Sequence, residues 1–323
     1  MKKSIREQIE ANKRGSFLFA SLMVVLISAL TSCIVGIAAP KYWQFGLLGG
    51  VGLSLLMVLI ARASGPGIVL SISGAREATD EEHRMLQNVV EEMAIAAGIP
   101  TPKVYVIEDS APNAFATGRD SNSGVVAITQ GLLRKLDRDE LQGVMAHEIA
   151  HIRNLDIRYM TTVSLMGGLI ALLSDVLSTQ LRWGAFSRRG RNRDNDGGSN
   201  PIFIVVGLLL AILAPLFGWL LQMAVSRQRE FLADASAAEM TRYPEGLASA
   251  LKKISYDPET LEVANRATQH MYIVNPLQLS KEGNDLFSTH PSTEARIKAL
   301  LGTSSFYEKE RRLMPSAPIE SEN

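Results

Sequence analysis

The sequence predicts a mainly helical membrane protein of the α+β class, in which two pairs of apolar helices accompany a soluble part with a small antiparallel sheet. Two long uncharged runs follow a polar, basic N-terminus, and two further apolar stretches come later, at 160–181 and 201–226. Short segments with strand-like composition lie between the two pairs. The second helical pair is therefore expected to be inserted into the soluble part.

The first pair is expected to form a transmembrane hairpin within residues 1–64. Residues 17–39 and 42–61 carry no charge, and each run has about the length that crosses a bilayer as a helix. A cleaved signal peptide is the alternative, but its apolar run is usually shorter, and here a second run follows at once. Basic residues lie before the first run and after the second, so the positive-inside rule places both flanks in the cytoplasm.

The second pair, within residues 160–226, is expected to form another membrane hairpin. Its first stretch contains Asp175 and its second contains Pro215. The loop between them is rich in Arg, Gly, Asn and Asp, which is typical of a flexible connection. If both stretches cross the membrane, the arginines of this loop lie outside, against the positive-inside rule. A shallow or packed helical pair stays open as the alternative.

The soluble part divides into a first section at 65–159, a second section at 227–301 and a polar tail at 302–323. In the first section the segments KVYVIED and GVVAIT are typical of short strands. Between them NAFATG, at 113–118, is extended but has little to fill a core on both faces. This segment is expected to be an edge strand.

A helix that begins after Asp137 carries the sequence MAHEIAHIRNLD. Residues four apart lie on one face of a helix, so His147 and His151 present both imidazoles to one ion. Glu148 lies about 100° further round, where its carboxylate reaches a water molecule without binding the ion. Zinc suits this arrangement because neutral imidazole binds it well. The alternative is a coincidental pair on a solvated face, and HExxH arises by chance in on the order of 1% of chains this long.

A catalytic zinc site also needs a third protein ligand and one open position. The third histidine of the metzincin pattern is absent, because Asn154 and Ile157 stand where Gly and His are required. The remaining candidates are a carboxylate further along the chain or one of three histidines, His83, His270 and His290.

The segment SRQREFLADASA contains a carboxylate pair that fits this need. Glu230 and Asp234 are four residues apart and share a helix face. One can bind the ion while the other orients a zinc-binding histidine. Taken alone, such an acidic pair is usually a solvated surface, and only the HExxH motif changes that interpretation.

Composition excludes several other classes. The chain has 33 basic and 33 acidic residues, so no field of one sign favours nucleic acid or a cationic partner. Its single cysteine, Cys33, excludes an internal disulfide framework and a cysteine-type zinc site. No pattern indicates an oligomeric state.

HEIAHIRNLD followed by a later EFLAD resembles the HtpX-type membrane zinc metalloproteases, relatives of the CAAX prenyl endopeptidases. The resemblance extends over nearly the whole chain, from the two N-terminal spans through NAFATG to a late THPS. HExxH alone is shared by many zinc peptidases, whereas HExxHxxNxD with the later acidic pair is far more specific. The resemblance implies a zincin-like catalytic domain on the cytoplasmic side of a bacterial inner membrane. It also implies quality control of misfolded or damaged membrane proteins.

The resemblance further implies roles for single residues. One Zn²⁺ ion per chain is held by His147, His151 and Glu230, and Glu148 is the general base. Asp234 supports a zinc-binding histidine, and Asn154 and Asp156 match a polar pair after the motif, although a helix C-cap explains Asn154 equally well. His290 and Arg296 resemble a pair that stabilises the oxyanion, with a surface turn before a helix as the alternative. An extended peptide adds by backbone hydrogen bonds to the edge strand Asn113, Ala114, Phe115, Ala116, Thr117 and Gly118.

The expected metal ligands lie close in sequence to the second apolar pair. His151 is nine residues before Met160, and Glu230 is four residues after Ser226. If the helices are continuous, their rise per residue puts the ion within roughly 15 Å of the apolar boundary. We therefore expect substrates that lie in the membrane or emerge from it.

Three competing functions are weighed against this one. A site-two-type intramembrane protease carries HExxH inside an apolar helix, but charged residues bracket the motif here. A prenyl-protein processing protease shares the chemistry, and the sequence does not separate the two. A non-catalytic membrane scaffold with a structural zinc is disfavoured, because structural sites are normally closed by four ligands.

Overall fold

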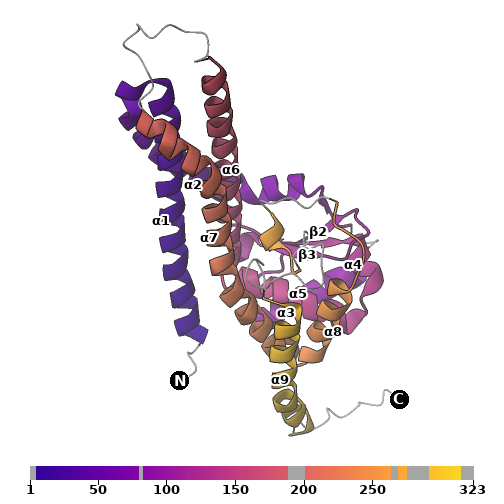
Figure 1. Cartoon of the computed structure of the whole chain (residues 1–323). Helices are drawn as coiled ribbons and strands as arrows, with labels where there is room; N and C mark the ends of the chain where they lie inside the picture. The colour runs from indigo at the N-terminus through magenta and orange to yellow at the C-terminus, as the bar shows by residue number, and fades with distance from the viewer. Residues whose placement is uncertain (1–4, 80–82, 188–200, 263–267, 275–290, 314–323) are drawn as a thin grey trace, which may run out of the picture.

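Four long helices and a smaller mixed domain make up the computed structural model, which describes residues 5–79, 83–187, 201–262, 268–274 and 291–313. The long helices stand side by side, and the mixed domain packs against them towards one end (Figure 1). They are α1 (Ile5–Ala38), α2 (Trp43–Ile72), α6 (Asp156–Ser187) and α7 (Pro201–Thr241). Among the described residues each contains a stretch long and apolar enough to cross a membrane.

Close backbone packing joins α1 to α2, with a short 3₁₀ turn (Pro40–Tyr42) between them. Thr31 donates its hydroxyl to the carbonyl of Gly46 at 2.7 Å. A Cβ atom at Gly50 would lie 2.5 Å from the Cα atom of Ser28, so only glycine allows this approach. Small residues of this kind let helix backbones approach closely in an apolar environment. The first helical pair is therefore a hairpin, as its sequence predicts.

The sheet has four strands in the order β1-β2-β4-β3, and it is mixed. Its strands are β1 (Arg76–Glu77), β2 (Lys103–Ile107), β3 (Ala114–Thr117) and β4 (Val125–Thr129). The prediction of an antiparallel sheet is wrong for its centre, because β2 and β4 pair in parallel. A parallel pair needs a crossover connection, and β3 with its flanking loops supplies it. The prediction of an edge strand at NAFATG is confirmed, since β3 ends the sheet beside β4.

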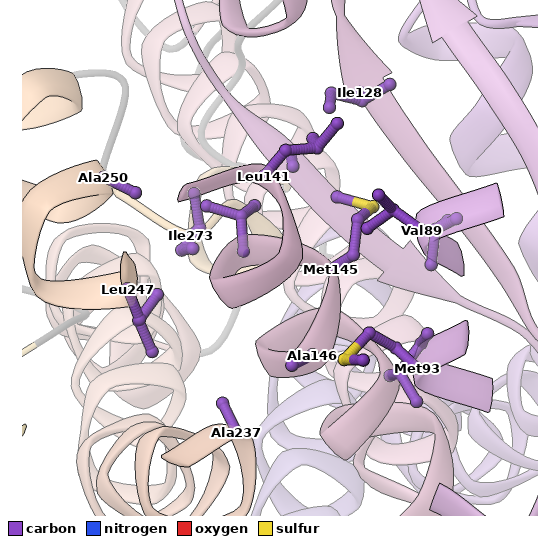
Figure 2. Packing of buried hydrophobic residues seen from close by; sticks show 14 of the residues in the cluster. Val89, Met93, Ile128, Leu141, Met145, Ala146, Ala237, Leu247, Ala250 and Ile273 are labelled. Atoms are coloured by element: carbon purple, nitrogen blue, oxygen red, sulfur yellow. The ribbon is translucent and has the colours of Figure 1, made fainter. Parts of the chain in front are cut away.

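Both faces of the sheet are covered, which explains why all five residues of β4 are buried. On one face lie α3 (Arg84–Ala97), α5 (Arg138–Arg153) and α8 (Pro244–Ser255), and Figure 2 shows their side chains around Met145. The opposite face packs against the end of α2 through Val69 and Leu70. The remaining elements are α4 (Gln130–Lys135), α9 (Thr293–Leu313) and two short 3₁₀ turns, Ser121–Ser123 and Gln269–Met271.

Three elements have a different extent from the segments expected from sequence. The first hairpin does not end at residue 64, because α2 continues to Ile72 and reaches the core of the mixed domain. The first part of the expected polar tail is helical, because α9 continues across Gly302 to Leu313. The HExxH helix is not continuous with α6, because Leu155, at φ 60°, interrupts the helix between α5 and α6. The predicted loop at 188–200 lies outside the described residues.

Candidate metal centre

Helix α5 positions the two histidines. Asp137 and Glu140 form a capping box at its start, which satisfies backbone N–H groups there. The helix is buried almost throughout, so its residues from Leu141 onward have fixed rotamers among neighbouring side chains. His147 and His151 lie one turn apart with their Nε2 atoms 3.2 Å from each other. Their exposed fractions are 0% and 2%.

Helix α7 brings Glu230 to the same point. Its Oε1 lies 3.4 Å from Nε2 of His151, and its Oε2 lies 3.6 Å from Nε2 of His147. A tetrahedral zinc site with bonds of about 2.05 Å has ligand atoms about 3.3 Å apart. The three observed separations of 3.2, 3.4 and 3.6 Å fit that size. Among the described residues this trio forms the group suited to a metal ion.

A carboxylate lies behind each histidine. Oδ1 of Asp234 is 3.0 Å from Nδ1 of His147, and Oδ2 of Asp156 is 3.2 Å from Nδ1 of His151. A ring whose Nδ1–H donates to a carboxylate has its Nε2 lone pair free for a metal. The structure therefore brings Asp234 and Asp156 to the positions from which they orient the two rings.

Each of these carboxylates is held in turn by a buried arginine. Arg296 donates to both oxygens of Asp234, at 2.9 and 2.7 Å, and its Nη2 lies 3.3 Å from Nδ1 of His147. Arg229 donates to Oδ1 of Asp156 at 2.7 Å. The arginines are 1% and 4% exposed. Each arginine thus places a positive charge directly against a buried carboxylate.

Glu148 has both carboxylate oxygens buried, and within the described residues neither has a hydrogen-bond partner. Burial raises the pKa of Glu148. A buried carboxylate without partners is costly in a folded protein. Its position beside His147 and His151 indicates that a cation or a water molecule completes its surroundings.

The charge balance of the metal-bound state, in which both histidines must be neutral, fits a dication. Two guanidinium groups, of Arg229 and Arg296, face four carboxylates, those of Glu148, Asp156, Glu230 and Asp234. With neutral histidines this leaves two negative charges in a buried volume. An ion of charge +2 offsets them, which agrees with the spacing of the ligand atoms.

In the metal-free centre the pKa values of both histidines are raised. Burial lowers the pKa of His151, but hydrogen bonds to Asp156 and Glu230 outweigh it and raise that pKa to about 10. Burial and the charge of Arg296 lower the pKa of His147, yet hydrogen bonds to Asp234 and Glu230 raise it overall. Burial opposes ionisation of Asp234, but Arg296 and His147 hold its pKa below the usual range.

The edge of β3 is covered by a segment from far along the chain, Tyr272–Val274. The N–H of Ile273 donates to the carbonyl of Ala114 at 2.9 Å, and Tyr272 pairs with Phe115 in an antiparallel bridge. The two rings make an edge-on contact with centroids 5.3 Å apart. Arg296 donates to the carbonyl of Ile273 at 2.7 Å. The covering segment therefore runs like an added strand that reaches the metal centre.

Side chains from the predicted edge strand are buried rather than open. Asn113 donates to the carbonyl of Val274 at 3.0 Å, and Thr117 contacts Thr161 at 3.2 Å. Gly118 follows the strand with φ 148°. The remaining residues of this predicted site, Ala114, Phe115 and Ala116, are at most 2% exposed.

The other candidate residues from the sequence do not belong to the group of three ligands. Asn154 is the C-cap of α5, as its alternative interpretation predicts. The Nε2 of His83 lies 3.2 Å from Nε2 of Gln130, beside the first turn of α4. His290 lies outside the described residues, as does the side chain of His270.

Sequence reasoning missed Arg229 and the Tyr272–Val274 segment. A sequence pattern could have identified Arg229, since this charged residue directly precedes Glu230 near an apolar stretch. A charge at such a place usually has a specific partner. No sequence pattern could have identified Tyr272, because its pairing with a strand more than 150 residues away leaves no local pattern.

Comparison with known proteins decides the family. The model of peptidase family M48 matches residues 80–304, which include every proposed ligand. The chain belongs to peptidase family M48. M48 peptidases are metalloproteases, so the buried trio and the carboxylate beside it lie in a hydrolytic enzyme.

Relatives with the name "Protease HtpX homolog" match almost end to end. The protein from Dictyoglomus thermophilum is 47% identical over 294 residues, which are 91% of this chain and 93% of that one. The protein from Thermoanaerobacter pseudethanolicus is 43% identical over 302 residues, or 93% and 98% of the two chains. The resemblance to HtpX-type proteases is confirmed, and the chain is a membrane-bound metalloprotease.

One solved structure has a weaker similarity to the chain. The crystal structure of Ste24p from S. mikatae has a TM-score of 0.49 and 21% sequence identity. The match covers 91% of this chain and 66% of Ste24p, slightly under two thirds of that protein. The family assignment rests on the sequence matches.

Proposed function

We propose that the chain is a zinc endopeptidase that holds one Zn²⁺ ion between His147, His151 and Glu230. The observation that carries this is the set of three ligand separations, 3.2, 3.4 and 3.6 Å, together with a partnerless carboxylate beside them. Two imidazoles and one carboxylate are a ligand set of catalytic zinc, which keeps one position open. When bound, the ion supplies a Lewis acid that polarises a peptide carbonyl and acidifies a water molecule.

Glu148 is proposed to transfer a proton from the attacking water to the leaving amine. Its raised pKa brings the carboxylate closer to the working range of a general base. Either oxygen accepts a proton from the attacking water, since neither is engaged by another described group. The same carboxyl group then returns the proton to the leaving amine. Asp234 and Asp156 keep the two imidazoles in the orientation that binds the metal.

Arg296 is proposed to bind the substrate carbonyl on which negative charge develops. Its Nη1 already donates to a peptide carbonyl, that of Ile273, while its other nitrogens hold Asp234. A peptide in place of the covering segment receives the same hydrogen bond, which strengthens as its oxygen becomes an oxyanion. His290 is proposed as the second donor, in line with the family resemblance.

The substrate is proposed to bind as an added strand on β3. The covering segment supports this proposal, because it lies antiparallel to Phe115 and donates a backbone hydrogen bond to Ala114. Strand addition gives affinity through backbone hydrogen bonds, so it suits substrates of many sequences. The segment Tyr272–Val274 has to leave this edge before a peptide occupies Asn113–Gly118.

We further propose that the four apolar helices span a bacterial inner membrane, with the catalytic domain on the cytoplasmic side. The basic N-terminal end of α1 lies at the same end of the helices as the catalytic domain (Figure 1). Glu230 and Asp234 lie on the same uninterrupted helix as the span Pro201–Gly218. Misfolded or damaged membrane proteins, brought to the site along the bilayer, are the proposed substrates.

The competing functions have less support. The helix α5 lies outside the apolar stretches, unlike the motif of a site-two-type intramembrane protease. A structural zinc in a scaffold explains neither the partnerless Glu148 nor its place beside the ligands. A prenyl-protein processing protease needs an isoprenoid-binding surface in addition to this centre.

Replacing Glu148 by glutamine tests the proposal. Glu148→Gln is expected to retain zinc and to lose at least about 10²-fold in the cleavage of a membrane-embedded test protein. Glu91→Gln, on the exposed face of α3, is the matched control and keeps full activity. A Glu148→Gln protein with most of its activity would refute the assigned role. Equal cleavage of a free peptide and its membrane-tethered form would refute the proposed substrate class.

A further inference from the structure

We propose that a cavity next to the metal centre binds the phosphate headgroup of an anionic phospholipid. The cavity measures about 380 Å³, within the range of about 300–1,000 Å³ typical of ligand sites. It lies where α1, α2, α6 and α7 meet the catalytic domain, and its lining comes from all four helices. This inference goes beyond the proposed protease activity, and it rests on the proposed membrane orientation but not on the proposed catalytic roles.

One wall of the cavity is apolar and belongs to the membrane helices. It contains Phe17 and Ala20 of α1 and Val58 and Ala61 of α2. Phe17 is 78% exposed in the isolated chain, which is typical of a side chain that contacts lipid. Acyl chains that lie along α1 and α2 therefore bring a headgroup to the mouth of this cavity.

The rest of the lining is strongly cationic. Four arginines line the cavity, Arg62, Arg119, Arg158 and Arg229, whereas Asp156 is the single acidic residue in the lining. Asp156 already pairs with Arg229 at 2.7 Å. Another acid, Asp120, acts on Arg158 from nearby. Within the described chain, the side chains of Arg62 and Arg119 have no ion-pair partner.

Two buried polar groups in the lining lack partners as well. Among the described residues, neither Nδ2 of Asn154 nor the hydroxyl of Tyr159 has a hydrogen-bond partner. The ring of Tyr159 lies 4.2 Å from the guanidinium of Arg229, so its hydroxyl is held next to the cationic part of the lining. Unsatisfied buried donors are costly unless a ligand or water completes them. Phosphate oxygens accept from several such donors and from arginines at once.

The position of the cavity fits a lipid rather than a soluble anion. Basic pockets between helices on the cytoplasmic side of a membrane are a recurring type of headgroup site. The apolar part of the lining makes no favourable contact with free phosphate. A phospholipid contacts this part with its acyl chains and the cationic part with its headgroup. The shared chemistry is a phosphate group, and the two sources are separated by experiment.

Lipid retention by the full purified chain tests the proposal. The chain in neutral detergent is titrated with phosphatidylglycerol, with phosphatidylcholine or with inorganic phosphate, and bound lipid is counted by native mass spectrometry. Phosphatidylglycerol is expected to bind with clear preference. Arg62→Gln with Arg119→Gln should weaken its binding about tenfold. Tyr159→Phe, which keeps the ring, should weaken it about fivefold.

The matched control is Arg84→Gln with Arg134→Gln, two exposed arginines outside the cavity. This pair is expected to leave phosphatidylglycerol binding unchanged. Equal weakening by both pairs would mean unspecific attraction and overturn the proposal. Full competition by inorganic phosphate would also overturn it, because the site would then take a free anion. If the cavity-lining pair changes KM for a peptide without changing lipid retention, the cavity is a substrate site and the lipid assignment fails.

Discussion

Replacing Arg296 by methionine is expected to destabilise the metal-free protein strongly at neutral pH. Arg296 is 1% exposed and donates to both carboxylate oxygens of Asp234 and to the carbonyl of Ile273. Methionine fills a similar volume but leaves a buried carboxylate without its cation. Removing one partner of a buried ion pair lowers the free energy of unfolding by about 3–5 kcal/mol.

The expected change in melting temperature follows from that loss. In a unit of this size each kcal/mol lost from the free energy of unfolding lowers the melting temperature by about 2–4 °C. The melting temperature of Arg296→Met should therefore be roughly 10 °C lower than that of the wild type. The control is Arg138→Met, which breaks a pair with Glu92 at 2.6 Å whose side chains are 51% and 43% exposed. An exposed pair contributes about 0–1 kcal/mol, and its loss should shift melting by less than about 4 °C. Scanning calorimetry of both metal-free variants in detergent measures the two shifts.

The pH dependence gives a second check on the same pair. Because Arg296 holds the pKa of Asp234 below its usual range, the pair stabilises the fold above about pH 4 and less as pH falls through the lower folded pKa. In Arg296→Met the unpaired carboxyl group takes up a proton instead. The difference in melting temperature between wild type and Arg296→Met should therefore become smaller at acidic pH. A shift at neutral pH no larger than that of Arg138→Met would refute the reasoning.

Three further outcomes are expected. Asp156→Asn weakens the support of the His151 ring and should lower metal affinity about 10- to 100-fold in competition with a chelator, whereas the exposed Asp139→Asn should not. Because the pKa of His151 is raised to about 10 without metal, metal binding must displace a proton, so affinity should rise between about pH 6 and 9 with measurable proton release. A metal affinity that does not change with pH would contradict the displacement of a proton from His151. Tyr272→Ala removes the ring that packs on Phe115 and should lower KM for a peptide about fivefold, while a raised KM argues against substrate binding along β3.

The histidine pair was predictable from sequence because its geometry is local. A helical repeat places His147 and His151 on one face, and the structure has their Nε2 atoms 3.2 Å apart. Glu230 was a candidate by its spacing from Asp234, and the family resemblance selected it. The apolar runs were equally clear, since length and absence of charge act over a single segment.

Features that depend on distant pairing were not predictable. The parallel pairing of β2 with β4 follows from the path of the chain between them, which composition does not encode. The cover over β3 joins Ile273 to Ala114, and the salt bridge behind His151 joins Arg229 to Asp156. Each of these contacts links residues that lie in separate segments of the sequence. A one-dimensional pattern contains the chemistry of such residues but not their partners.

The order of the proposed ligands along the chain has a consequence for biosynthesis. His147 and His151 are translated before the second helical pair, and Glu230 is translated after it. A nascent chain therefore has two imidazoles but lacks the third ligand until α6 and α7 come together. We therefore expect the proposed metal centre to be completed only in a chain whose second helical pair is already in place.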